Sequence, residues 1–214
     1  MELEDSEAAL LAKYGVKDET AGRENAWLAR EYLLGVARAI IQKGAITMDH
    51  MIAAGMVARA QALHEAAIAA IDSDNPHASF TLLRSYAEQC AAVLYLTDHP
   101  DKARNLWDDS DGRSVKIEPI TNYAQNSGRL RRFKDVYDRL SKYTHPSSTA
   151  HFSSFRSGEG RTFTWQSAPR FKRDEEKLVA YAWCIEFAYA THVFLFEYAQ
   201  ARGLLKAVRP EQAP

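Results

Sequence analysis

The sequence predicts an all-α protein, a helical bundle that carries one inserted β-hairpin at about residues 151–166. Hydrophobic residues make up 46% of the 214-residue chain, enough for one sizeable core. Glycine and proline, with 10 and 7 copies, are too scarce for an all-β fold with many tight turns. We therefore expect one domain at residues 21–205, between an acidic N-terminal segment at 1–20 and a tail at 206–214.

Capping residues and a glycine divide the first half of the chain into three long helices. Gly44 ends the first of them. Thr47 can cap the second, and Asn75 followed by Pro76 provides an N-cap and a proline at the first helical position of the third. The second helix has almost no continuous polar face, which is typical of the central helix of a bundle. The expected helices run over about 21–43, 48–72 and 76–97.

The second half of the chain predicts shorter helices before a long final one. Pro100 and Pro119 each mark a helix start, and Gly128 is a break before the segment RLRRFKDVYDRLSKY. The final helix begins with three acidic residues, which suit the positive end of a helix dipole, and ends before Gly203. Its aromatic content predicts burial on most sides or a subunit interface. These helices are expected at about 100–109, from 118, at 129–143 and at 173–202.

Residues 151–166, HFSSFRSGEGRTFTWQ, show the one good strand pattern in the sequence. Two segments rich in aromatic residues, Ser and Thr flank SGEG, which is typical of a β-hairpin. A hairpin inserted between helices costs little loop entropy and often carries a surface function.

The charge of the chain is strongly uneven. Residues 129–173 hold eleven Lys or Arg against three Asp or Glu, a net charge of +8, although the whole chain has a net charge of −1. Such a basic region attracts phosphates, or it faces the acidic part of the same chain or of a partner. Next to Arg161, the Trp165 ring could stack on a base. The expected phosphate- or partner-binding residues are Arg129, Arg131, Arg132, Lys134, Lys142, Arg156, Arg161 and Trp165.

The sequence argues against a membrane protein and against a secreted protein. Residues 51–71 and 178–199 are long and apolar, but both carry charges that are costly in a bilayer, so both are expected to be core helices without membrane contact. The N-terminus lacks the basic and apolar regions of a signal peptide. Cys90 and Cys184 lie in apolar runs and are expected to be buried free thiols, which favours a cytoplasmic location.

Metal and cofactor motifs are missing from the sequence. It contains no Glu-x-x-His motif, no Cys/His metal spacing, no phosphate-binding loop and no nucleophile elbow. We therefore expect no metal and no cofactor.

One segment, YDRLSKYTHPSS (137–148), places Arg139 six residues before His145. Together with LLRSYAEQCAAVLYLTDHP (82–100), it resembles a group of poorly characterised helical proteins of bacteria and phages. The Arg-x₅-His spacing is also similar to that of the HEPN superfamily. This resemblance implies a helical bundle, a homodimer and RNA cleavage, with Arg139 on the phosphate and His145 as general acid or base. Leu140 departs from the family pattern, which usually has a polar residue there.

The geometry of an α-helix predicts whether the Arg139 and His145 side chains can meet. A separation of six residues puts two side chains about 120° apart, so Arg139 and His145 diverge on a straight helix. A break before Pro146 would let His145 swing toward Arg139.

The alternative role of His145 is structural. Arg84 and Glu88 lie four residues apart on one helix, and Ser141 lies one turn before His145. These residues predict a satisfied, buried polar cluster that fixes the register of two helices.

Three functions stay open on the sequence alone. The leading one is a HEPN-like protein that contacts RNA or another phosphate-bearing partner through residues 129–173, as a binding protein or as a ribonuclease. The second is a non-enzymatic module that binds an acidic protein. The third is a small-ligand pocket within the bundle near Arg84 and Glu88.

Overall fold

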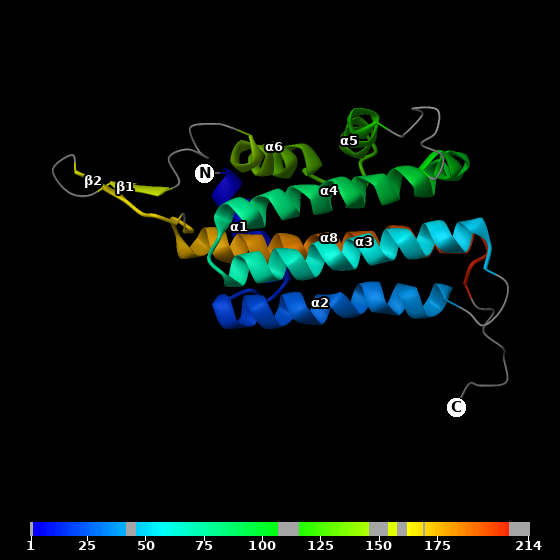
Figure 1. Cartoon of the computed structure of the whole chain (residues 1–214), viewed down its shortest axis with the longest axis horizontal. Coiled ribbons are helices and arrows are strands. Elements are labelled where there is room, and N and C mark those ends of the chain that lie inside the picture. The colour runs from blue at the N-terminus through cyan, green and yellow to red at the C-terminus, as the bar shows by residue number, and fades with distance from the viewer. Residues whose placement is uncertain are drawn as a thin grey trace.

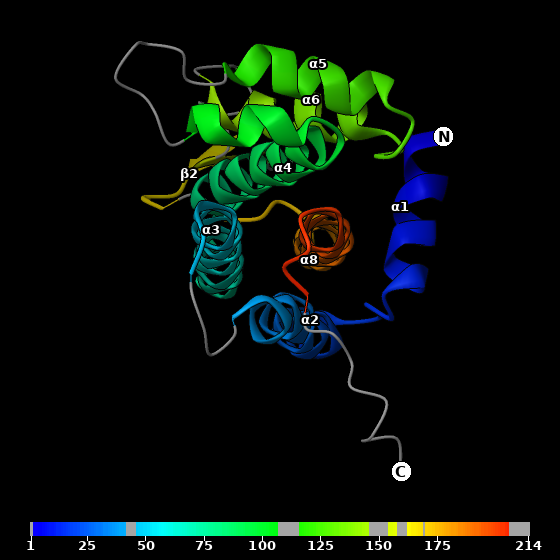
Figure 2. The same ribbon diagram turned by 90° about the vertical axis from the view of Figure 1, so that its right-hand side faces the viewer.

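The all-α class is confirmed by the computed structural model, and four long helices run side by side along the molecule (Figure 1). Viewed down their common direction, α8 lies in the middle, with α2, α3 and α4 around it (Figure 2). The central helix is therefore α8, and not α3 as the sequence pattern predicted. The four helices are α2 (Glu19–Ile40), α3 (Met48–Asp72), α4 (Pro76–Asp98) and α8 (Asp174–Ala201). The structure describes residues 2–41, 46–106, 116–145, 154–157, 162–168 and 170–205.

The predicted helix starts at Thr47 and Asn75 are confirmed. Thr47 and His50 form a capping box at the start of α3. At the start of α4, the Asn75 side chain accepts a hydrogen bond of 3.1 Å from the backbone N–H of Ala78, and Pro76 occupies the first turn. Local sequence therefore fixes where these two helices begin.

Within the described ranges, four shorter helical segments accompany these long helices. The sequence pattern did not predict α1, which stands beside α8 and away from α3 (Figure 2). Both α5 and α6 lie over α4 (Figure 1). These segments are α1 (Glu2–Lys13), the 3-10 helix η1 (Pro100–Leu106), α5 (Ile117–Asn126) and α6 (Phe133–Thr144).

The start of α6 differs from the prediction of a helix over 129–143. The helix begins at Phe133, because Gly128 and Arg132 adopt left-handed backbone angles, with φ of +70° and +61°. A right-handed helix cannot run through either residue. Residues 129–132 are therefore an irregular segment, and it brings Arg129 against Glu197 and Phe194 of α8.

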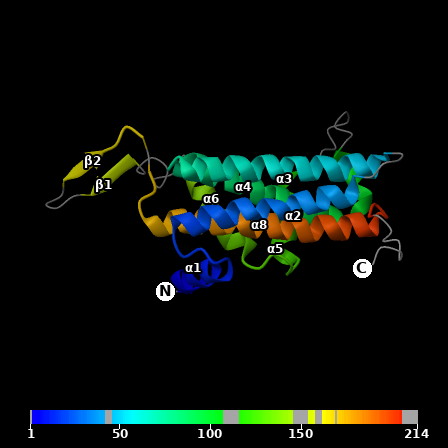
Figure 3. The same cartoon turned by 90° about the horizontal axis from the view of Figure 1, so that it is seen from below.

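The predicted β-hairpin is confirmed. Strand β1 (Phe155–Ser157) pairs antiparallel with β2 (Phe163–Trp165), and Phe155 lies opposite Trp165. Figure 3 shows the hairpin projecting past the end of the bundle where α8 begins. Trp165 is exposed, as a stacking residue must be. Arg156 lies on β1, and Arg161 lies outside the described residues.

The core centres on α8 and includes both cysteines. As predicted, Cys90 and Cys184 are buried free thiols. Burial raises the pKa of Cys90 to about 12 and also raises the pKa of Cys184. Both thiols are therefore protonated and unreactive at neutral pH.

His64 links three helices inside this core. Its Nε2 lies 2.8 Å from the Ala26 carbonyl oxygen of α2, and its Nδ1 lies 3.2 Å from Cys184 Sγ of α8. Burial lowers the pKa of His64, so the ring is neutral. The neutral ring donates to Ala26 and accepts from the Cys184 thiol, which satisfies both nitrogens.

Of the described helices, α8 is the one long and apolar enough to cross a membrane. The bundle buries 72% of its apolar window, as expected of a core helix.

Candidate functional site: an arginine groove and a polar cluster beside α6

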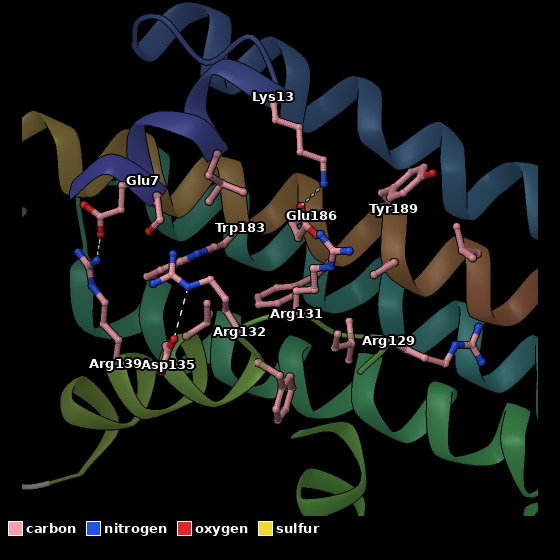
Figure 4. Close-up of a pocket in the computed structure, with 18 of the residues that line it drawn as sticks. Glu7, Lys13, Arg129, Arg131, Arg132, Asp135, Arg139, Trp183, Glu186 and Tyr189 are labelled. Carbon is pink, nitrogen blue, oxygen red and sulfur yellow. Dashed lines mark hydrogen bonds and ion pairs between the residues drawn. The ribbon is translucent and has the colours of Figure 1, made fainter. Parts of the chain in front are cut away.

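A groove of about 430 Å³ lies between α1, α8 and residues 129–139 (Figure 4). We call it the arginine groove. Its floor is apolar, with Phe133, Trp183 and Phe194 among the contributing side chains. Of the described residues in the predicted contact region, those that line this groove fall within 129–139, and none belongs to the described part of the hairpin. Its charged residues are Lys13, Arg129, Arg131, Arg132 and Arg139, with Glu7, Asp135 and Glu186.

Arg139 is tied to the N-terminal helix. Its guanidinium forms an ion pair with Glu7 of α1 and lies 5.2 Å from the ring centroid of Trp183 on α8. Partial burial lowers the pKa of Arg139 from its usual high value, and the group stays charged. A second anchor of α1 lies at its other end, where Lys13 Nζ is 2.9 Å from a Glu186 carboxylate oxygen.

Arg129 is also paired with acids of its own chain. It lies 2.8 Å from a carboxylate oxygen of Asp98 on α4, contacts Glu197 on α8, and lies 4.9 Å from the ring centroid of Phe194. These contacts hold the irregular segment 129–132 in place. They match the expectation that part of the basic region faces acidic residues of the same chain.

The remaining basic residues of this region are more open to solvent. Arg132 and Lys134 form exposed pairs with acids of α6, at 3.4 and 3.8 Å, of a kind that contributes little to stability. Arg131 is exposed and has no ionic or hydrogen-bonding partner within the described part of the chain. Lys142 is exposed near the end of α6.

The predicted polar cluster forms between α4 and α6. Arg84 Nη1 lies 3.1 Å from His145 Nε2, and Arg84 Nε lies 3.2 Å from Glu88 Oε1. Arg84 Nη2 also donates to the Tyr137 hydroxyl at 3.1 Å, and that hydroxyl donates to Glu88 at 2.7 Å. We define the polar cluster as Arg84, Glu88, Tyr137 and His145.

Three features of the polar cluster differ from the prediction. Tyr137 belongs to it, although the sequence pattern did not include this residue in the cluster. Ser141 donates instead to the backbone carbonyl of Tyr137, at 2.7 Å. The cluster is also open to water, because His145 is exposed and the Arg84 and Glu88 side chains are 20% and 26% exposed.

The missed contribution of Tyr137 has a sequence signal. Tyr137, Ser141 and His145 are spaced by four residues and therefore share one face of α6. A tyrosine on that face carries a hydroxyl toward the same helix that the histidine meets.

Arg139 and His145 contact different parts of the molecule. Arg139 meets α1 and α8, whereas His145 meets Arg84 of α4. His145 has the extended backbone expected before a proline, and its N–H still closes the last turn of α6 on Ser141. The divergence matches the angle of about 120° expected for six residues of helix.

Neither described cavity includes Arg84 or Glu88. The second cavity, of about 280 Å³, lies between α3 and α4 and is lined by residues such as Met51 and Leu96. Within the described ranges, no group of three or more His, Cys, Asp or Glu side chains could hold a metal ion.

Comparison of the chain with protein-family models, with curated proteins and with solved structures found no match.

Proposed function

We propose that this protein is HEPN-like and contacts a phosphate-bearing partner, RNA foremost, through the arginine groove. The observation that carries the proposal is the gathering of four arginines, 129, 131, 132 and 139, along one groove with an apolar and aromatic floor. Arginines with aromatic side chains are the combination that single-stranded nucleic acids use, because phosphates need charge and bases need stacking surface.

The four arginines differ in what they can offer to a phosphate. Arg131 and Arg132 are exposed and have spare donors, so they supply the first contacts. Arg129 and Arg139 already hold carboxylates of their own chain. A phosphate reaches Arg139 only by replacing Glu7, which would loosen α1.

Binding is the main part of this proposal, and cleavage through Arg139 and His145 is a smaller part. Cleavage by this pair would need His145 to leave Arg84 and the two side chains to converge. The proposal includes the homodimer and the cytoplasmic location expected from the sequence. A dimer would cover exposed aromatic side chains such as Tyr32, Tyr189 and Phe196.

Fluorescence anisotropy with a labelled single-stranded RNA tests the proposal. Wild type should bind, and log affinity should fall with log salt by about 0.7 for each phosphate contacted. Arg131→Gln should weaken binding and reduce this slope by about that amount. Arg38→Gln is a matched control, because Arg38 is an exposed arginine on α2 outside the groove.

Two results would contradict the proposal. One is no RNA binding by wild type at low salt, which would favour the non-enzymatic module for an acidic protein. The other is equal weakening by Arg131→Gln and Arg38→Gln, which would place the attraction in the overall charge and not in the groove.

A further inference from the structure

We infer that the polar cluster is a second anion site, in which a phosphate oxygen bridges Arg84 and His145. The inference rests on the proposed function for the nature of the ligand, a phosphate group. It uses none of the residues that line the arginine groove. The site therefore adds a second contact point for the same partner on the other side of α6.

The contact between Arg84 and His145 is unusual in its chemistry. Arginine has only donors, so the 3.1 Å contact requires an unprotonated Nε2 on His145. The proton of the neutral ring then lies on Nδ1. Two side chains that can each bind an anion therefore face each other across this contact.

A bridging phosphate oxygen would satisfy both side chains better. It would accept a hydrogen bond from Arg84 Nη1, and His145 could take up a proton on Nε2 and donate to the same oxygen. Both hydrogen bonds would then join a cationic donor to an anionic acceptor, which makes them stronger than the present contact between a cationic donor and a neutral imidazole. Binding at this site is therefore expected to be coupled to protonation of His145.

Arg84 is already oriented for this role. Glu88 lies against its Nε, and the Tyr137 hydroxyl accepts from its Nη2, while its guanidinium carbon lies 5.2 Å from the Tyr137 ring centroid. These contacts leave Nη1 directed at His145. A fixed guanidinium loses little side-chain entropy when an anion binds.

His145 is placed so that it can make room for a ligand. It is exposed and follows the last residue of α6, with an extended backbone. Its ring can turn away from Arg84 without breaking a helix. Among the described residues, Arg84 of α4 contacts the His145 ring directly, and Glu88 of α4 and Tyr137 of α6 contact Arg84.

Nuclear magnetic resonance of the histidine ring nitrogens tests the inference. Inorganic phosphate and sulfate are titrated into the full chain at neutral pH, and His145→Gln identifies the His145 signals. Sulfate does not titrate there, so it separates uptake of a proton by the ring from protonation of the ligand. We expect both anions to move the His145 Nε2 signal from the unprotonated toward the protonated position.

Two variants test whether the anion response of His145 depends on Arg84 and not on the arginine groove. Arg84→Gln should weaken the response at least tenfold, and Arg131→Gln, in the arginine groove, should leave it unchanged. Circular dichroism checks that both variants are folded. If Arg84→Gln lowers the helix content, Arg84→Lys is used, which keeps the charge and should restore part of the response.

The outcomes separate the inference from the proposed function. No change at His145 Nε2, or equal responses in wild type and folded Arg84→Gln, would show that the inference is wrong. If RNA binds as proposed while the anion response is missing, only the inference fails. If RNA does not bind but phosphate and sulfate still protonate His145, the proposed function fails and the site stands as an anion site for a small molecule.

Discussion

The two histidines His64 and His145 each join helices, but they do so in opposite surroundings. His64 is fully buried, and its two nitrogens have a carbonyl and a thiol as partners. His145 is exposed and faces the donor-only guanidinium of Arg84. Both ring nitrogens of His64 have hydrogen-bonding partners within the core. His145 instead faces a guanidinium that would bind an anion more strongly than it binds a neutral imidazole.

This difference in burial distinguishes a histidine that stabilises the core from a histidine that is free to bind a ligand. An arginine five or six residues before a histidine occurs twice in the chain, as Arg59 before His64 and as Arg139 before His145. Burial with satisfied hydrogen bonds makes His64 part of the core. Exposure beside a fixed arginine makes His145 the better candidate for binding.

The largest expected difference between the two histidines is in stability. His64→Ala would leave a cavity and two unpaired polar groups, at Ala26 and Cys184, so the free energy of unfolding should fall by about 2–4 kcal/mol. The exposed His145→Ala should lower it by less than about 1 kcal/mol. Urea denaturation of both variants measures this, and equal losses would remove the distinction.

The pH dependence of stability should come from His64. Because burial lowers its pKa in the folded state, the unfolded chain binds a proton more readily at this residue. The contribution of His64 to stability is full above the unfolded pKa of about 6.5 and is lost as pH falls below it, by at most about 1.4 kcal/mol per pH unit. His64→Gln should flatten the profile of unfolding free energy in that range, and an unchanged profile would contradict a neutral buried ring.

The smallest expected effect compares two arginines of the groove. Arg129→Gln removes contacts to Asp98 and Glu197, and the unfolding free energy should fall by about 1 kcal/mol, since these pairs are partly exposed. Arg131→Gln should leave stability unchanged while it weakens RNA binding. Thermal denaturation followed by circular dichroism checks both, and a larger loss for Arg131 would mean that this residue has a structural role.

Much of the fold could be predicted because its signals are local. Thr47 and Asn75 cap helices through side chains that reach their own first turns, and the hairpin follows from aromatic and β-branched residues on both sides of SGEG. The start of α6 was missed because its arginines fit a helical pattern. Left-handed angles at Gly128 and Arg132 override that pattern.

The candidate sites could be predicted only in part. Four-residue spacing placed Arg84, Glu88 and His145 on faces that can meet, and the structure brings them together. Nothing local indicated that α1 would fold against α8 and place Glu7 on Arg139. Contacts between segments so far apart depend on packing, which periodicity does not specify.

By itself, the sequence determined the helical class, most helix boundaries and the hairpin, because caps, turn residues and the periodicity of side chains act within a few residues. Only the tertiary structure decided that α8 is central, that Arg129 and Arg139 are paired with acids of their own chain, and that Arg84 meets His145 at the surface. The physical reason is that burial and ion pairing depend on which helix faces meet, and that is settled by the packing of the whole chain.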